Sequence, residues 1–259
     1  MTNGNQNHKK NGSPFIFTWI LPLFLRPKKT TAEIAAQERN VWLTPLVLVS
    51  ALAIIAVFLS APIRREAIQM GATLPPNFEY YSPDQQQQFY EAQATQTSPL
   101  FLYVFPMLGG LLKLWVSWFL LSVILYLVFT IFGSRASSLK SYNLVAWSFL
   151  PIALRYIVQI LATLITHTQI ANPGLSGFVS ADATGFGAYL RSLIGLIDIY
   201  FIYQIILLFL GSKPLSGLTK TKAWVATGIS IFILLLLQAI PGLVSSMLSN
   251  LTFTSMFYF

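Results

Sequence analysis

Long apolar stretches dominate the chain, and short polar segments separate them. A helix needs about 20 mainly apolar residues to cross a bilayer core of about 30 Å. Five stretches meet this requirement, at residues 42–60, 114–132 (with an apolar extension back to residue 100), 142–166, 192–211 and 223–249. The pattern predicts an all-α, polytopic membrane protein whose membrane domain, residues 42–249, is a bundle of five transmembrane helices.

The composition agrees with this class and excludes several chemistries. Hydrophobic residues make up 55% of the chain and charged residues 9%, against about 25% charged residues in soluble domains. There is no cysteine, which excludes disulfides, thiolate metal sites and thiol nucleophiles. His8 and His167 lie far apart in the sequence, and no P-loop, dinucleotide-binding or zinc-protease motif occurs. We therefore expect no metal site, no cofactor and no enzymatic activity.

The positive charges predict the orientation. Six Lys and Arg residues precede the first apolar stretch, two lie between the second and third, and three lie between the fourth and fifth. The opposite loops hold Arg64, Arg65 and Arg191 beside most of the acidic residues. Because Lys and Arg favour the cytoplasmic side, we expect a multi-pass protein of the cell membrane with a cytoplasmic N-terminus and an external C-terminus. The net charge of +8 then reflects topology and does not indicate nucleic-acid binding.

The segments outside the spans have distinct characters. Residues 1–13 are polar and predicted to be disordered, and residues 250–259 form an external tail. Residues 14–41 contain an apolar run with cations on both sides, which favours a cytoplasmic interfacial segment over a signal peptide. Within this segment, Arg26, Lys28 and Lys29 are candidates for contact with anionic lipid headgroups or partners, although positive-inside topology alone would also place them there.

The predicted external loop, residues 62–99, contains a helix signal. Ser82 can cap a helix, and Pro83 is suited to its first turn. The short helix would carry Phe89 and Tyr90. It can be a surface helix that packs on the mouth of the bundle or an element that docks a partner.

Two charges fall inside the predicted spans and need compensation. Arg155 would lie about 16 Å, and Asp198 about 10 Å, from the external ends of their helices. An uncompensated charge in a membrane costs several kcal/mol, so a bidentate ion pair between these neighbouring helices is the expected solution. Ser148, Gln159 and Thr163 lie on the same helical face as Arg155. The pair and this polar stripe can fix helix register or line a cavity for a ligand or ion, or each charge can reach an interface separately. Lys113 is expected to reach the external interface.

Several stretches resemble the Yip1 domain family in order and spacing. They are RPKKTTAEIAAQ, FGSRASSLKSYNLVAWSFLPIAL, DIYFIYQIILLFLG and TKTKAWVA, and the similarity runs from Arg26 to Met247. Tyr203 and Ser134 depart from residues common in the family. The resemblance implies a five-span, non-enzymatic membrane component of a bacterial type. Eukaryotic relatives act in vesicle traffic, and some bacterial relatives accompany ABC-type exporters.

These observations support two functional hypotheses. The first is an accessory or scaffold protein that lies in the lipid bilayer and associates with other integral membrane proteins. The alternative is a small-solute transporter or channel that uses a polar intramembrane cavity around Arg155 and Asp198. A water-filled cavity that reaches Arg155 would favour transport, and a dry, closed pair would favour the scaffold. A membrane enzyme would need a nucleophile and base that the sequence does not show.

Overall fold

A computed structural model describes residues 15–71, 78–168, 174–180 and 183–255. This part of the chain is helical and contains no strand. Its elements are α1 (Ile20–Leu25), α2 (Pro27–Ala35), α3 (Leu43–Gly71), η1 (Phe78–Tyr80), α4 (Pro83–Gln96), η2 (Leu100–Val104), α5 (Phe105–Ile131), α6 (Ser138–Ser148), α7 (Leu150–Thr166), η3 (Ser176–Phe178), α8 (Phe186–Gly195), α9 (Ile199–Ser216) and α10 (Lys220–Ser255).

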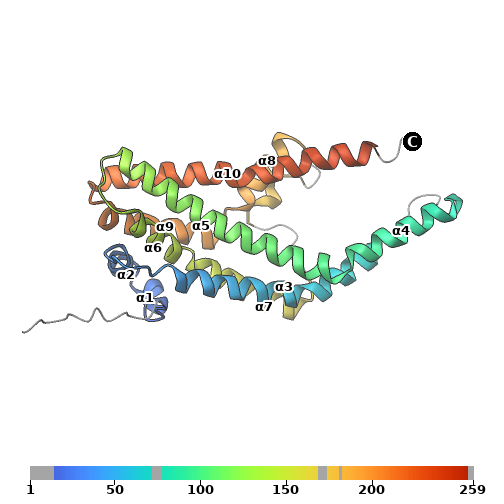
Figure 1. The fold of residues 1–259 in the computed structure, drawn as a ribbon, viewed down its shortest axis with the longest axis horizontal. Coiled ribbons are helices and arrows are strands. Elements are labelled where there is room, and N and C mark those ends of the chain that lie inside the picture. Colours follow the sequence, from blue (N-terminus) through green and yellow to red (C-terminus); the bar gives the residue numbers. More distant parts are fainter. Residues whose placement is uncertain (1–14, 72–77, 169–173, 181–182, 256–259) are drawn as a thin grey trace, which may run out of the picture.

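Five segments of the described chain are long and apolar enough to span a membrane. They are Leu43–Gln69, Leu100–Ile131, Ser138–Thr166, Ile199–Ser216 and Lys220–Val244. The predicted all-α membrane protein with five spans is therefore confirmed. Helices α1 and α2 lie at one end of the elongated molecule, and the C-terminal end of α10 points to the other end (Figure 1).

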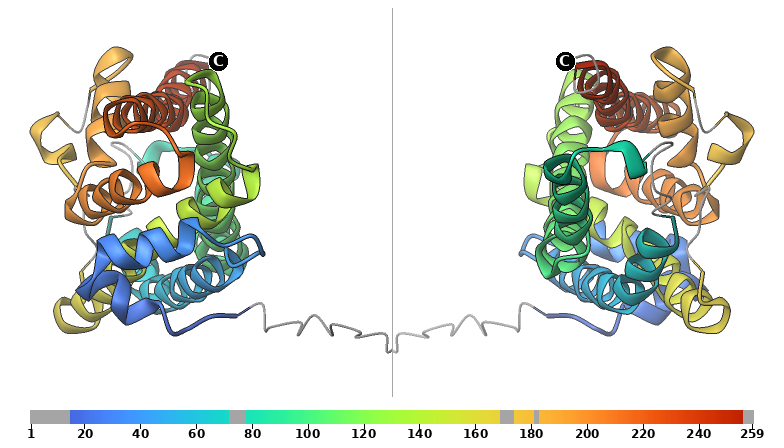
Figure 2. Two further views of the ribbon diagram at one scale, coloured as in Figure 1. Left: turned by 90° about the vertical axis from the view of Figure 1, so that its left-hand side faces the viewer. Right: turned by 90° about the vertical axis from the view of Figure 1, so that its right-hand side faces the viewer.

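The long helices pack in pairs around an apolar core. Helix α3 packs on α7, while α5 and α8 both pack on α10. Viewed from the ends, α6 and α9 lie between these groups (Figure 2). Trp147, Phe129 and Leu207 are buried in this core, whereas Ile131 and Ile165 are exposed. Exposed apolar side chains on spanning helices are expected where a helix faces hydrocarbon.

The N-terminal helices belong to the same core. Leu23 of α1 and Ile34 and Ala35 of α2 are fully buried. Helix α1 packs on α2, and α2 packs on α9 and α6. Trp19 contacts Trp147 edge to face, with ring centroids 5.5 Å apart. Residues 14–41 thus include a packed part of the bundle, although Phe17, Leu21 and Leu25 in this segment are exposed. The prediction for residues 1–13 lies outside the described residues.

The first spanning helix is longer than predicted. The apolar pattern ends at Ser60, and we expected the external loop to begin at Pro62, but α3 continues to Gly71 with Pro62 inside it. Hydropathy marks where apolar residues stop, and the polar sequence that follows is still compatible with helix. Pro62 removes one backbone hydrogen bond without ending the helix.

The short helix predicted in the following loop is confirmed as α4. Ser82 Oγ accepts a hydrogen bond from the Gln85 backbone N–H at 3.3 Å, and the Ser82 N–H donates to Gln85 Oε1 at 3.0 Å. This reciprocal capping box defines the start of the helix. In Figure 1, α4 lies beyond the end of the bundle that is opposite α1 and α2.

Two of the remaining spans differ in detail from their expected ranges. The third is divided at Phe149 into α6 and α7. Pro151 explains the division, because it has no N–H to donate to the preceding turn. Helix α10 continues past the expected end of the last span to Ser255. Residues 256–259 of the predicted tail lie outside the described residues.

Candidate functional site

The fourth predicted span, residues 192–211, is wrong as a continuous helix. Helix α8 ends at Gly195, and α9 begins at Ile199. Asp198 therefore does not lie within a helix, because it is the N-cap of α9 in an extended conformation. Hydropathy could not reveal this break, since Leu196 and Ile197 are as apolar as the helices on either side.

The Asp198 carboxylate serves two partners at this break. Its Oδ1 accepts a hydrogen bond of 2.8 Å from the backbone N–H of Phe201 in the first turn of α9. Arg155 Nη2, on α7, lies 2.7 Å from both Oδ1 and Oδ2. The carboxylate thus satisfies a free N–H of α9, is favoured by the positive end of that helix, and neutralises the arginine.

The contact between Arg155 and Asp198 differs from the expected fork. A bidentate pair would use two guanidinium nitrogens, whereas here one nitrogen contacts both oxygens. Arg155 Nε is buried and has no hydrogen-bond partner within the described residues. The guanidinium carbon also lies 5.9 Å from the centre of the Tyr200 ring, within the range of a cation–π interaction. The Nε–H of this arginine is therefore a buried donor that protein atoms of the described part do not use.

A glycine lets a neighbouring loop pack against the helix break. Gly174 has φ +58°, and a Cβ at this position would lie 2.5 Å from the Gly195 carbonyl oxygen and 2.7 Å from that of Ile197. The next residue, Leu175, donates its backbone N–H to the Ile194 oxygen at 3.3 Å. Only glycine fits this close approach in this conformation. The loop thus donates to a carbonyl in the last turn of α8, where carbonyls lack partners within the helix.

The residues of the predicted polar stripe on α6 and α7 lie in three different environments. Ser148 is buried in the core, and its hydroxyl donates to the Val145 oxygen at 2.7 Å. Arg155 faces Asp198. Gln159 and Thr163 line a cavity of about 230 Å³ that also contacts Arg64 of α3. These five candidate residues therefore do not line a single pocket.

A smaller cavity of about 140 Å³ reaches Arg155 itself. Gln204 of α9 and Gln238 of α10 contribute polar side chains to its wall. The Gln238 side-chain N–H donates to Ser117 Oγ at 2.6 Å. At about 30 Å³ for each water, this space has room for a few waters.

The sequence reasoning overlooked both glutamines. Each is the single amide of its candidate span, as Arg155 is the single cation of α7. An isolated polar residue in a span indicates a buried partner. That signal could have identified them.

The basic residues before the first span are accessible. Arg26, Lys28 and Lys29 are exposed at the junction of α1 and α2. Lys29 Nζ lies 3.9 Å from Glu33 Oε1, one helical turn away. Such an exposed pair contributes little to stability, so these side chains remain able to contact other charged groups.

A second polar cluster, at the end of the bundle near α1 and α2, connects α6 to the segment before α3. Asn143 Oδ1 accepts from the Val41 N–H at 3.0 Å, and Asn143 Nδ2 donates to the Arg39 oxygen at 2.9 Å. Trp147 Nε1 donates to the Val41 oxygen at 2.9 Å. We call Asn143 and Trp147 the α6 clamp. Sequence reasoning missed it because the residues it joins are about 100 positions apart.

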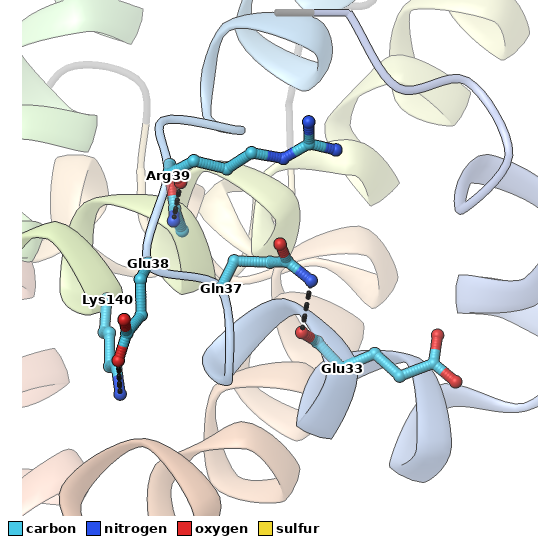
Figure 3. Close-up of polar contacts among 6 residues, drawn as sticks. Glu33, Gln37, Glu38, Arg39 and Lys140 are labelled. Carbon is cyan, nitrogen blue, oxygen red and sulfur yellow. Dashed lines mark hydrogen bonds and ion pairs between the residues drawn. The ribbon is translucent and has the colours of Figure 1, made fainter. Parts of the chain in front are cut away.

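Figure 3 shows the polar contacts around the clamped segment. Gln37 donates to the backbone oxygen of Glu33 at 3.4 Å, and Lys140 lies 3.9 Å from the Glu38 carboxylate (Figure 3). Glu38 is exposed. The clamp itself, in contrast, is buried.

Comparison with known proteins decides the family. The family model described as the Yip1 domain matches residues 22–240, which is most of the chain. The chain belongs to the Yip1 domain family. No curated protein and no solved structure matches it significantly.

The region that matches the Yip1 domain contains both polar clusters. It includes the α6 clamp, Arg155, the α8–α9 break and Asp198. It begins within α1, so the packed N-terminal helices belong to it. Among the described residues, no group of three or more His, Asp or Glu side chains could hold a metal ion.

Proposed function

We propose that this Yip1 domain protein is a non-enzymatic accessory or scaffold component that associates with other integral membrane proteins. An ABC-type exporter or an assembly like those of membrane traffic would be such a partner. We further propose that it is a multi-pass protein of the cell membrane with its N-terminus in the cytoplasm. The distribution of Lys and Arg supports this orientation.

The observation that carries the proposal is the projecting α4. None of the 14 residues of α4 is buried, and the helix lies past the end of the bundle (Figure 1). A helix of this length is marginal on its own in water. Phe89 and Tyr90 pack against Phe78, with ring centroids 5.0 and 5.7 Å apart, while the rest of the surface is free for a partner.

The chemistry of the buried sites also supports association without a reaction. Arg155 and Asp198 are in direct contact at 2.7 Å, so neither is poised as an isolated acid or base. Exposed Arg26, Lys28 and Lys29, with Phe17, Leu21 and Leu25 nearby, suit a surface that meets anionic headgroups or a partner's acidic residues.

Site-specific crosslinking in membranes tests the proposal. A photoreactive residue in place of Tyr90 on α4 should give a discrete crosslink to an integral membrane protein. Phe119 on α5 is the matched control, because Tyr90 is 54% and Phe119 50% exposed but Phe119 lies on a spanning helix. The same products at both positions, or none at Tyr90, would contradict docking through α4.

A small-solute transporter or channel is the second candidate, and the cavity beside Arg155 is the observation that favours it. The cavity has polar side chains among its mainly apolar lining and is lined in part by Arg155, whose Nε has no hydrogen-bond partner among the described residues. Its volume of about 140 Å³ suits water or a small ion. Flux of small anions into proteoliposomes, abolished by Arg155→Leu, would support transport and count against a purely structural pair.

A further inference from the structure

A groove separate from the Arg155–Asp198 pair opens between α5, α8 and α10. Its volume is about 650 Å³. Leu112, Val116, Leu120 and Leu237 form its apolar wall, and Lys113, Ser117 and Gln238 form part of its polar wall. Leu112 is 66% exposed and Val116 43%, so the apolar side faces the surroundings of the bundle. In a membrane, these surroundings are lipid chains.

Glycines on two of the helices shape the groove. A Cβ at Gly109 on α5 would meet no atom within 4 Å, so this position borders open space. A Cβ at Gly242 on α10, in contrast, would lie 1.8 Å from Ser192 Oγ of α8. The glycine on α10 therefore allows α8 to approach closely, as small residues do between membrane helices, and the glycine on α5 leaves the space between the helices unfilled.

The polar wall carries an uncompensated positive charge. Within the described residues, Lys113 has no acidic side chain within ion-pair distance. Two other cations lie nearby. Arg155 faces Asp198, and Arg191 of α8, which also lines the groove, donates to the Ser180 carbonyl oxygen at 3.5 Å. No described residue that lines the groove or the adjoining cavity at Arg155 is acidic. Because a lone ammonium is unfavourable near hydrocarbon, an anionic ligand would satisfy this site.

The depth of Lys113 matches a lipid headgroup region. Lys113 lies 18 residues before Ile131, the end of its helix, which is about 27 Å along the axis. That distance nearly equals the hydrocarbon thickness of about 30 Å. Gln238 of α10 lies at a similar depth, because its side chain donates a hydrogen bond to Ser117, which is one helical turn from Lys113. The lysine therefore lies close to the interface opposite the α1–α2 end, where lipid phosphates are found.

We propose that the groove between α5, α8 and α10 binds one anionic phospholipid, with the phosphodiester on Lys113. The negative charge of the phosphodiester complements Lys113, which has no acidic partner among the described residues, and Arg191 of α8 adds a second cation to the lining of the groove. Ser117 and Gln238 lie beside it as polar groups, and an acyl chain packs along Leu112, Val116 and Leu237. This site lies at the opposite end from Arg26, Lys28 and Lys29, and it does not depend on the proposed scaffold function.

Lipid retention by the purified full-length chain tests the site. Native mass spectrometry would compare phosphatidylglycerol with phosphatidylethanolamine of identical chains. The wild type should retain one phosphatidylglycerol about fivefold or more in preference to the zwitterionic lipid. Lys113→Gln should remove this preference, and Lys113→Arg should keep it. Lys220→Gln, on α10 at the other end of the bundle, is the matched control and should change nothing.

A second pair of variants tests the apolar wall without changing charge. Gly109→Leu should fill the groove and reduce retention of both lipids about tenfold. Gly228→Leu on α10 is its control, because a Cβ there also meets no atom within 4 Å but the residue does not line the groove. Both variants replace a helical glycine, so their propensity effects are matched.

Several outcomes would overturn the assignment. Unchanged lipid preference in Lys113→Gln would exclude the lysine as the anion site, and equal loss in Lys220→Gln would indicate a general charge effect. Undiminished retention in Gly109→Leu would exclude the groove. If inorganic phosphate alone displaced the bound lipid completely, the site would be one for a free anion.

Discussion

In the α6 clamp, Asn143 and Trp147 make three hydrogen bonds to backbone atoms of residues 39–41. Arg155, in contrast, contacts both oxygens of one carboxylate through a single nitrogen, and its Nε has no partner among the described residues. The clamp is neutral and fully buried. The ion pair is charged, and its side chains are 28% and 20% exposed. A buried, neutral hydrogen-bond network whose groups have partners stabilises the fold. A charged pair that has a spare donor and lies beside a cavity can also interact with water or an ion.

The comparison predicts that the largest loss of stability comes from the clamp. Asn143→Leu removes the partners of the Val41 N–H and the Arg39 oxygen. Each lost partner costs about 1–3 kcal/mol, so we expect about 2–6 kcal/mol in total. Denaturant unfolding in detergent would measure it. Gln37→Leu is the control, because the hydrogen bond of 3.4 Å that Gln37 makes is exposed. An equal loss of stability in this variant would show that burial does not make the clamp bonds more important than an exposed one.

Breaking the ion pair should have the next largest effect, and it should be asymmetric. Asp198→Asn keeps an N-cap for α9 but leaves the Arg155 cation without a counter-ion, at a cost of about 2–3 kcal/mol. Arg155→Leu leaves a carboxylate that still accepts from Phe201 and faces a helix N-terminus, so its cost should be about 1 kcal/mol smaller. Thermal unfolding of both variants checks the order. The reverse order would contradict the capping role of Asp198.

Trp147→Phe should weaken the clamp by about 1–2 kcal/mol. The variant keeps most of the ring but loses the hydrogen bond from Nε1 to the Val41 oxygen. Phe129, also an aromatic residue of the core, provides a comparison through Phe129→Leu, which changes packing alone. A Trp147→Phe variant as stable as the wild type would show that the indole contributes only volume.

The smallest effect is expected at the exposed ion pair beside the clamp. Lys140 and Glu38 are 3.9 Å apart, and Glu38 is 86% exposed. Lys140→Gln should therefore change stability by less than about 0.5 kcal/mol. The same unfolding measurement applies. A loss comparable to that of Asn143→Leu would mean that the clamp depends on surface charge.

Much of the fold follows from the sequence because lipid imposes simple constraints. The five spans and the Ser82 cap can be predicted from apolar length and capping signals. The partner of Arg155 can be predicted because a charge in a span needs compensation. The α8–α9 break could not be predicted, because it depends on a carboxylate that caps α9 and pairs with Arg155 at once. The α6 clamp could not be predicted either, because its hydrogen bonds join side chains to backbone atoms about 100 positions away in the sequence.

One carboxylate, that of Asp198, both caps α9 and compensates Arg155. A double-mutant cycle of Arg155→Leu and Asp198→Asn, read by unfolding in detergent, tests this dual role most directly. We expect a coupling of about 1–2 kcal/mol, with the double variant more stable than the sum of the single losses implies. In the Arg155→Leu background, Asp198→Ala should be about 1 kcal/mol less stable than Asp198→Asn, because alanine cannot cap the helix. Additive single losses and equal stability of these two double variants would contradict it.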